Sequence, residues 1–523
     1  MKILPVIAEN GHVKLKIKLL NSKKKQYPQT LGELKKQGFH RRTVKDELRE
    51  NLIKKLQNNE KIFPGIEGFD DTVIPDLQRA ILSRHNILLL GLRGQAKTSI
   101  ARLMVNLLDE YIPVVKGSEI NDDPFDPQSF YAKDKIEQEG DNTEIAWMPR
   151  DQRFTEKLAT PDVTVADLIG DADPIKAATL KLPYSDERVI HYGLVPRANR
   201  GIFTINELPD LQARIQVALF NILQEGDIQI RGFTLRMPLD IQFIFTANPE
   251  DYTNRGAIVT PLKDRIDSQI LTHYPRDIAT SGKITRSQAS TDDEQKHAIT
   301  IDPLMADLIE QVAFEARVSE YIDPKSGVSA RLTISAYENL YSAAERRSLI
   351  NNEKTTSSRL SDLQGIIPAI TGKIELVYEG EQEGPVNVAH HLLGKAIRTQ
   401  FPQYFSNPEK LQRDPAANPF KNIVGWFEKG NSIELHSDMS TEQYKRELDK
   451  VTGLKEIVQK HQGDIEVSKQ YLLMEFLLHG LAEFSMLSKD ILTNGHSFKD
   501  IVSGMLSKGY PEDEEDFDEQ DDF

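Results

Sequence analysis

The sequence has no cysteine among its 523 residues. Disulfides, thiol nucleophiles and thiolate zinc sites are therefore excluded. It also lacks any run of roughly 18 apolar residues, the length that a helix needs to cross a bilayer. Residues 1–20 alternate between apolar and polar side chains instead of building the apolar region of a signal peptide. We therefore expect a cytoplasmic protein without a membrane span.

Basic side chains are outnumbered, and the formal net charge is −15. With 39% hydrophobic and 28% charged residues, the composition is that of a globular protein. Residues 511–523 carry nine acidic side chains and no basic ones, and so few apolar groups predict a disordered tail. Basic residues gather within residues 1–60, where a solvated surface is favoured over nucleic-acid binding.

The chain is organised around residues 87–99, Ile-Leu-Leu-Leu-Gly-Leu-Arg-Gly-Gln-Ala-Lys-Thr-Ser. An apolar run followed by a glycine-containing turn and a helical pattern predicts a strand, a phosphate loop and a helix, with backbone N–H groups facing an anion. In such a loop Lys97 reaches the terminal phosphates and Thr98 holds Mg²⁺. The alternative is an ordinary strand-turn-helix connection. The candidate ATP-binding residues are Gly91, Gly94, Gln95, Ala96, Lys97, Thr98 and Ser99.

Ala96 departs from the phosphate-loop pattern G-x-x-x-x-G-K-[ST], which has glycine at this position. Alanine adds only a methyl group. We therefore expect the close approach of backbone to phosphate to survive if Ala96 keeps a negative φ.

Two further apolar runs end in polar side chains that suit phosphate chemistry. Ile202–Ile205 is followed by Asn206 and Glu207, at the strand end where α/β sheets place their chemistry. Glu207 is the candidate to polarise the attacking water. Asn206 would help to hold Mg²⁺, with one negative charge fewer than an aspartate. Asn248, after the next apolar run, is placed to contact the γ-phosphate or its water; the alternative is a cap of the turn before Pro249.

The remaining elements are predicted from local pattern. We expect the second strand at Tyr111–Lys116, insertions between residues 113 and 200, and a hairpin around Arg231-Gly232. A fifth strand is expected at Ser268–His273, and residues 279–300 have the composition of a linker. Residues 301–510 are mostly helical in pattern. His390 and His391 would point roughly 100° apart on a helix, which makes a poor metal pair.

The order of these motifs resembles that of AAA+ ATPases of the magnesium-chelatase ATPase-subunit and MoxR group, from about residue 63 to 345. The matching segments are GLRGQAKT as Walker A, GIFTINELPDL as Walker B, TANPEDYTNRG as sensor 1, TPLKDRID as the arginine-finger segment and GVSARLT as sensor 2. The resemblance implies an α/β fold: a doubly wound parallel five-stranded sheet with a helix-2 insert and a pre-sensor hairpin, followed by a helical lid. The mostly helical C-terminal region that follows is predicted from sequence pattern alone.

This resemblance also implies the domain limits and the remaining roles. It covers the ATPase domain (61–280) and the linker and lid (281–350). Outside the resemblance, pattern and composition predict an N-terminal extension (1–60), a helical C-terminal region (351–510) and the acidic tail (511–523). Asn248 would sense the γ-phosphate and Arg331 would be sensor 2. Arg265 would enter the site of the neighbouring subunit in a ring, usually a hexamer; by itself, an Asp-Arg pair is more often a surface ion pair.

The function expected from the resemblance is Mg²⁺-dependent ATP hydrolysis that remodels or activates a partner protein. Because no von Willebrand A domain is evident in the sequence, we expect such a domain on a separate partner chain. Three alternatives stay open: a magnesium-chelatase ATPase subunit proper, an AAA+ transcription activator, and an ATP-dependent switch with little hydrolysis. Absence of a GAFTGA run weighs against the activator.

Overall fold

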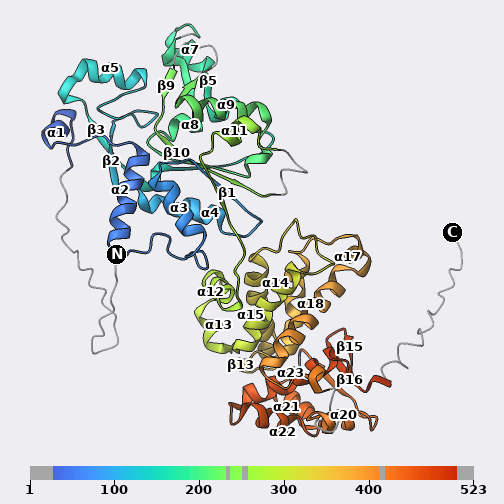
Figure 1. Cartoon of the computed structure of the whole chain (residues 1–523). Coiled ribbons are helices and arrows are strands. Elements are labelled where there is room, and N and C mark those ends of the chain that lie inside the picture. The colour runs from blue at the N-terminus through green and yellow to red at the C-terminus, as the bar shows by residue number, and fades with distance from the viewer. Residues whose placement is uncertain (1–26, 185, 231–235, 250–256, 412–417, 503–523) are drawn as a thin grey trace, which may run out of the picture.

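The computed structural model describes residues 27–184, 186–230, 236–249, 257–411 and 418–502. These residues form an α/β body, from α1 to β11, and a second, mainly helical body from α12 onward (Figure 1). The predicted acidic tail, the first 26 residues, and the segments 231–235 and 250–256 lie outside the described residues.

A five-stranded sheet forms the centre of the α/β body. Its order is β11-β1-β10-β7-β4, and every neighbouring pair is parallel. The strands are β1 (Ile87–Leu90), β4 (Phe154–Leu158), β7 (Gly201–Asn206), β10 (Ile241–Ala247) and β11 (Ser268–Leu271). Every residue of β1, β7 and β10 is buried, as expected for parallel strands covered on both faces. The predicted doubly wound five-stranded parallel sheet is confirmed.

A strand lies where the second strand was predicted, but it is not part of the main sheet. Residues Tyr111–Val115 form β2, which pairs antiparallel with β3 (Ile145–Pro149) outside the main sheet. The edge of the main sheet is β4, with the sequence FTEKL. An edge strand is covered less completely than a central one, so it needs no continuous apolar run, and the apolar run YIPVV looked like the better strand.

Side chains from alternate strand positions enter two separate cores. On β1, Ile87 and Leu89 belong to the core covered by α2 (Val44–Gln57), α3 (Val73–Leu82) and α4 (Lys97–Leu103). Leu88 and Leu90 belong to the opposite core, which is covered by α9 (Ala213–Glu225). Helix α2 therefore packs into the core of the α/β body, although it lies in the segment expected as an N-terminal extension.

Insertions decorate this body, as predicted. The helix-2 insert comprises α6 (Val165–Leu168), β5 (Gly170–Ala172), α7 (Pro174–Leu180), β6 (Ile190–Tyr192) and α8 (Leu194–Arg197), with β5 antiparallel to β6. Helices α1 (Leu31–Lys36) and α5 (Phe130–Glu139) lie near β3 (Figure 1). The predicted hairpin is β8 (Asp227–Gln229) with β9 (Arg236–Pro238), and its turn lies outside the described residues. Helix α11 (Thr260–Asp264) precedes β11.

The predicted linker at 279–300 is instead largely helical. Helices α12 (Ile278–Gln288) and α13 (Asp293–Ala298) each begin after an aspartate whose carboxylate accepts a hydrogen bond from a backbone N–H of the first turn. These caps are Asp277 and Asp292. The Ser- and Thr-rich composition suggested a linker, but N-capping by aspartate was the stronger local signal.

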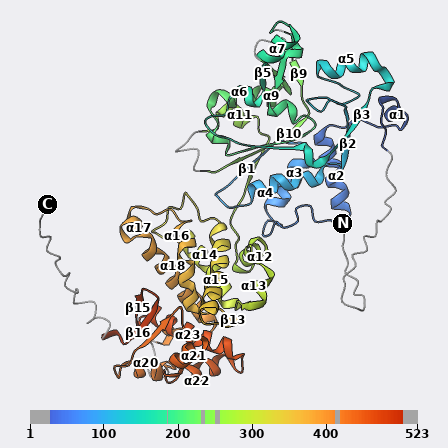
Figure 2. The ribbon, with the colours of Figure 1, turned by 180° about the vertical axis from the view of Figure 1, so that it is seen from behind.

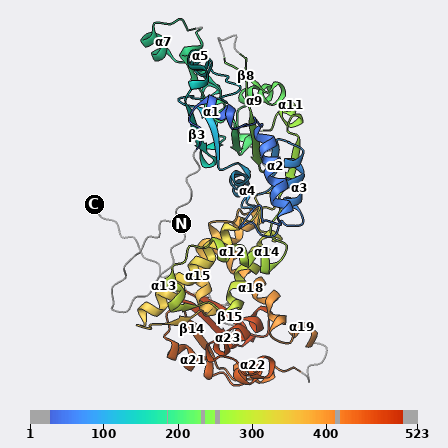
Figure 3. The ribbon, with the colours of Figure 1, turned by 90° about the vertical axis from the view of Figure 1, so that its left-hand side faces the viewer.

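The second body has one hydrophobic core that extends from Ile299 to Phe498. Its larger helices are α14 (Pro303–Arg317), α15 (Arg331–Ile350), α18 (Pro385–Gln400), α21 (Thr441–Asp449), α22 (Leu454–Gln462) and α23 (Val467–Glu483). Smaller helices are η6 (Leu360–Ile366), α16 (Ile367–Thr371), α17 (Tyr378–Glu383), α19 (Pro408–Leu411) and α20 (Lys421–Phe427). Figures 2 and 3 show these helices stacked from α14 down to α22.

Strands also occur in this second body, which the sequence did not predict. β14 (Ile433–His436), β15 (Ser488–Leu492) and β16 (Gly495–Lys499) form an antiparallel sheet with β16 in the centre, and β12 (Ile299–Thr300) pairs with β13 (Thr356–Ser357). Helix α23 is buried along most of its length, which confirms its apolar sequence as core. In the part of the chain that the structure describes, no helix is long and apolar enough to cross a membrane.

Candidate nucleotide site

The predicted phosphate loop lies at the carboxyl end of β1, between the carboxyl ends of β10 and β11. Gly91 N donates a hydrogen bond to Ala247 O at 3.2 Å, which ties the start of the loop to β10. Gly94 has φ +73°, a conformation that side chains disfavour. The loop ends at Lys97, the first residue of α4.

Ala96 adopts φ 56° and ψ 15°, so the condition of a negative φ is not met. This residue is the N-cap of α4, and its carbonyl accepts a hydrogen bond from Ile100 N at 2.9 Å. The chain turns from loop to helix through the left-handed region, which costs an alanine roughly 1–2 kcal/mol. The conformation at position 96 is therefore one that glycine, the residue of the pattern, adopts without strain.

Three predicted site residues from three segments form one hydrogen-bonded chain. Lys97 is buried, and its Nζ donates to Asn248 Oδ1 at 2.7 Å and to Leu92 O at 3.0 Å. Asn248 Nδ2 in turn donates to Glu207 Oε2 at 2.8 Å. Glu207 itself lies in the left-handed region, at φ 54°. The ends of β7 and β10 thus bring an ammonium, an amide and a carboxylate together beside the loop.

The two residues expected at the Mg²⁺ position lie close together. Thr98 Oγ1 is 3.5 Å from Asn206 Oδ1, and Thr246 Oγ1 donates to the same oxygen at 3.1 Å. Oxygen donors are what Mg²⁺ prefers, together with phosphate oxygens and water. The donors of Thr98 and Asn206 therefore fit this ion, with one carboxylate fewer than usual.

A fourth residue at this position was missed from the sequence. Glu156, the middle residue of β4, accepts a hydrogen bond from Asn206 Nδ2 at 2.6 Å. No local signal marked Glu156, because it lies in the middle of β4, which had not been identified as a strand of the main sheet.

Two residues of the predicted binding loop face other directions. Gln95 is buried, and its Oε1 accepts a hydrogen bond from Thr272 Oγ1 at 2.7 Å, beyond the end of β11. Ser99 is exposed on α4. Gln95 therefore fixes the base of the loop, whereas Lys97 and Thr98 face the other motifs.

Arg331 lies next to the loop because α15 begins there. A Cβ placed on Gly94 would lie 2.9 Å from both Ala330 N and Ser329 Cα. Arg331 follows directly as the exposed first residue of α15. The second body thus reaches the phosphate loop through the N-terminus of this helix.

Arg93 adds further contacts between the loop and the second body. Its guanidinium forms an ion pair with Glu375, and its carbonyl accepts a hydrogen bond from Tyr274 OH at 2.8 Å. The guanidinium carbon of Arg317 lies 4.3 Å from the centre of the Tyr274 ring. Burial lowers the pKa of Arg317, whose three guanidinium nitrogens have no hydrogen-bond partner among the described residues.

Arg265 lies apart from the other site residues. It follows α11, forms an ion pair with Asp264, and stacks with its guanidinium carbon 5.3 Å from the centre of the Phe220 ring. Its side chain is 38% exposed. Within the described part of the chain, no hydrogen bond or ion pair joins Arg265 to Lys97, Glu207 or Asn248.

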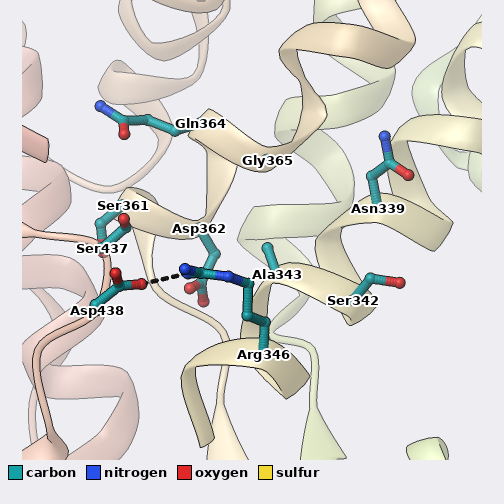
Figure 4. A pocket seen from close by; sticks show the side chains of 10 residues that line it. All are labelled: Asn339, Ser342, Ala343, Arg346, Ser361, Asp362, Gln364, Gly365, Ser437 and Asp438. Atoms are coloured by element: carbon teal, nitrogen blue, oxygen red, sulfur yellow. Dashed lines mark hydrogen bonds and ion pairs between the residues drawn. The ribbon is translucent and has the colours of Figure 1, made fainter. Parts of the chain in front are cut away.

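A cavity of about 300 Å³ lies away from this site, between α15, η6 and the loop at 437–438 (Figure 4). Its charged side chains already have partners: Arg346 pairs with Asp438, and Asp362 pairs with the buried Arg347. The remaining lining consists of small or neutral polar residues. None of the predicted site residues lines it.

Comparisons with known proteins agree with the motif order. The family model described as Sigma-54 interaction domain matches residues 183–268. The "Magnesium-chelatase 38 kDa subunit" of Cereibacter sphaeroides is 28% identical over 207 residues, 39% of this chain and 56% of the relative. The subunit of the same name from Rhodobacter capsulatus is 25% identical over 237 residues, 45% of this chain and 62% of the relative. The chain thus spans somewhat more than half of each relative.

Among solved structures, one is described as a complex between subunits BchI and BchD of magnesium chelatase. It matches with a TM-score of 0.32 and 20% identity, over 61% of this chain and 98% of that chain. The fold assignment therefore rests on the strand order and the placement of the motifs. These define a P-loop AAA+ protein. The relatives show that the chain is similar, over about two fifths of its length, to the 38 kDa subunits of magnesium chelatase.

Proposed function

We propose that this protein hydrolyses ATP with Mg²⁺ and uses the energy to remodel or activate a partner protein. The observation that carries the proposal is the hydrogen-bonded chain from Lys97 through Asn248 to Glu207. A pure binding site needs a cation for the phosphates, but it has no use for a carboxylate held by an amide at the same place. Hydrolysis needs both.

The residues divide the work of phosphoryl transfer, which depends on positioned water and cations more than on covalent chemistry. Lys97 would neutralise charge on the β- and γ-phosphates. The Glu207 carboxylate would accept a hydrogen bond from the attacking water, and Asn248 would hold that carboxylate while it contacts the γ-phosphate. Bound at Thr98 and Asn206, Mg²⁺ would supply electrostatic stabilisation of the phosphate oxygens.

Arg265 is proposed to act in the site of a neighbouring subunit. It is partly exposed, and within the described residues no hydrogen bond or ion pair ties it to the site of its own chain. In the proposed ring, a hexamer, it would stabilise charge on the transferred phosphoryl group. Arginines supplied in this way increase rates by roughly 10³–10⁵ elsewhere, so hydrolysis should depend on assembly.

The proposed role and partner are based on the proteins to which the chain is similar. The similar proteins are named as a subunit of magnesium chelatase, and the similar structure is a complex between two subunits of that enzyme. We propose a MoxR- or chelatase-like role with a separate von Willebrand A domain chain, and the domain limits given above. The second body, which contacts the phosphate loop through α15, would transmit the nucleotide state to the partner.

The test is ATP hydrolysis per chain, measured against protein concentration with and without Mg²⁺. For the unaltered chain we expect the rate to rise with assembly. Glu207→Gln and Arg265→Ala should each lower it by at least about 100-fold, a loss of about 2.7 kcal/mol in transition-state stabilisation.

Arg188→Ala is the matched control for Arg265→Ala. Arg188 also pairs with a nearby aspartate, Asp186, and stacks over the ring of Phe130 at 5.6 Å. Its removal should leave hydrolysis unchanged. Tight ATP binding with negligible hydrolysis, at every protein concentration and with the partner present, would contradict the proposal. It would favour the alternative of an ATP-dependent switch with little hydrolysis.

A transcription activator is the second candidate, favoured by the match of residues 183–268 to the Sigma-54 interaction domain. That segment holds β7 and β10, which are shared elements of the AAA+ sheet. The sequence contains no GAFTGA run. Sequence-specific DNA binding by the full chain, measured by fluorescence anisotropy, would support this candidate.

A further inference from the structure

We propose that Glu156 is a positioning residue for Mg²⁺. It would supply the negative charge that Asn206 lacks and orient the Asn206 amide toward the ion. This inference rests on the proposed function and deepens it. Its basis is the hydrogen bond of 2.6 Å from Asn206 Nδ2 to Glu156 Oε1.

The strand register places the two side chains on one face of the sheet. β4 and β7 are parallel neighbours, and Glu156 lies opposite Thr204. Asn206 is two residues beyond Thr204, and side chains two residues apart on a strand share a face. Glu156 therefore points at Asn206 because of the sheet geometry, and this contact does not depend on a loop.

Helix α4 presents matching partners from the other side. Thr98 and Arg102 are four residues apart, so they lie on the same helix face. Thr98 faces Asn206, while Arg102 donates to Glu156 from Nε at 2.8 Å and from a terminal nitrogen at 3.1 Å. The four side chains form a row, with the expected Mg²⁺ ligands at one end and the ion pair at the other.

Glu156 determines which end of the Asn206 amide faces the ion. An ionised carboxylate only accepts hydrogen bonds, so the amide nitrogen must point toward Glu156. The amide oxygen then points toward Thr98 and Thr246. Mg²⁺ binds oxygen ligands. Without the Glu156 carboxylate, the amide could turn over and present its nitrogen to the ion.

Glu156 also restores part of the missing charge. An aspartate at position 206 would bring a negative charge into direct contact with the metal, and Asn206 brings none. The Glu156 carboxylate, 22% exposed, would lie further from the metal than residue 206, since it contacts Asn206 through a hydrogen bond. Arg102 neutralises it only in part, because the Arg102 side chain is 62% exposed and its charge is screened by water.

The experiment measures binding of a fluorescent ATP analogue to the full chain as a function of Mg²⁺ concentration. We expect Glu156→Gln to raise the Mg²⁺ concentration at half-saturation about 10- to 100-fold, the usual effect of losing a group that orients a metal ligand. Binding in EDTA should be unchanged, which also shows that the variant folds. Glu144→Gln is the control, because Glu144 forms an exposed ion pair with Lys116 away from the site.

A double-mutant comparison with Asn206→Asp makes the test sharper. In the unaltered chain, Asn206→Asp would place two carboxylates in direct contact and should weaken Mg²⁺ binding or thermal stability. In the Glu156→Gln background the same change should restore Mg²⁺ binding toward the original value. Equal effects of Asn206→Asp in both backgrounds would overturn the inference.

Failure of this inference can be told apart from failure of the proposed function. If the unaltered chain binds no nucleotide, both fall. If it binds nucleotide in a Mg²⁺-dependent way and Glu156→Gln leaves that dependence unchanged, only the role of Glu156 falls. Should Glu156→Gln not fold, Glu156→Asp keeps the charge but withdraws it from Asn206 by one methylene. An unchanged Mg²⁺ dependence in that variant would again overturn the inference.

Discussion

At the scale of single residues, Ala96 holds a conformation that suits glycine better. Its φ of 56° lies in the left-handed region. We expect Ala96→Gly to raise the free energy of unfolding by up to about 1 kcal/mol, since the relief of strain exceeds the extra entropy of the unfolded chain. Denaturant unfolding of the full chain measures the change.

The control for Ala96→Gly is the same substitution in a right-handed helix. Ala279 is exposed in α12, so Ala279→Gly should lower the free energy of unfolding by roughly 0.5–1 kcal/mol. A loss of stability in both variants would show that the strain at Ala96 is relieved by its surroundings.

Residue identity and order along the chain were enough to predict which side chains gather beside the phosphate loop. Lys97, Glu207 and Asn248 follow separate apolar runs, and the structure brings them within hydrogen-bond distance. Glu156 could not be found this way, because it lies in a polar edge strand with no apolar run to mark it. Gln95 belongs to the phosphate-loop pattern, but its side chain turns toward Thr272, a contact that only tertiary structure decides.

At the scale of elements, the contact between the phosphate loop and α15 depends on Gly94. Gly94→Ala would place a methyl group against Ser329 and Ala330 and would also strain a φ of +73°. We expect ATP to bind about tenfold more weakly, a cost of about 1.4 kcal/mol, because α15 must move away from the loop. Isothermal titration with ATP measures the affinity.

Gly226→Ala distinguishes the effect of a strained φ from the effect of a steric clash with α15. Gly226 has nearly the same φ, +70°, but a Cβ there meets nothing within 4 Å. This variant should lose roughly 1 kcal/mol of stability and keep its affinity for ATP. If Gly226→Ala and Gly94→Ala weaken ATP binding equally, contact with α15 is not the cause.

The type of an element was predicted correctly where its hydrophobic pattern determines it. The prediction failed where the element's place in the tertiary structure determines its type. The central strands β1, β7 and β10 are buried on both faces, so their sequences are apolar throughout. β2 was expected in the main sheet in place of β4, because β4 is an edge strand and its sequence is not apolar throughout. In the sheet of β14, β15 and β16, β14 pairs with the distant β16, which local pattern does not reveal, whereas the local hairpin of β15 and β16 was overlooked in a region expected to be helical.

At the scale of the whole molecule, the predicted lid and C-terminal region share one hydrophobic core, from Ile299 to Phe498. A charged network inside this core joins distant segments. Glu475 of α23 accepts hydrogen bonds from Leu360 N and Ser361 N at the start of η6, both at 2.9 Å. It also accepts one from Tyr444 OH of α21 at 2.8 Å.

Burial raises the pKa of Glu475 to about 7, although these hydrogen bonds and Arg359 act in the opposite direction. Because the folded state holds this proton more tightly than the unfolded state, the contribution of Glu475 to stability is fully present below the unfolded pKa. It is lost as the pH rises through the folded pKa. The free energy of unfolding should therefore fall between about pH 4.5 and 7, and this contribution should stay constant above that range.

Glu475→Gln removes this titration. Its free energy of unfolding, compared with that of the unaltered chain, should rise steadily across the same pH range and then level off. Glu381→Gln removes an exposed carboxylate of α17 in the same body, so its difference from the unaltered chain should not follow that course. Denaturant unfolding at a series of pH values gives both differences. If the difference for Glu475→Gln is independent of pH, Glu475 is ionised throughout, and the contact between α23, η6 and α21 is then a permanently charged one.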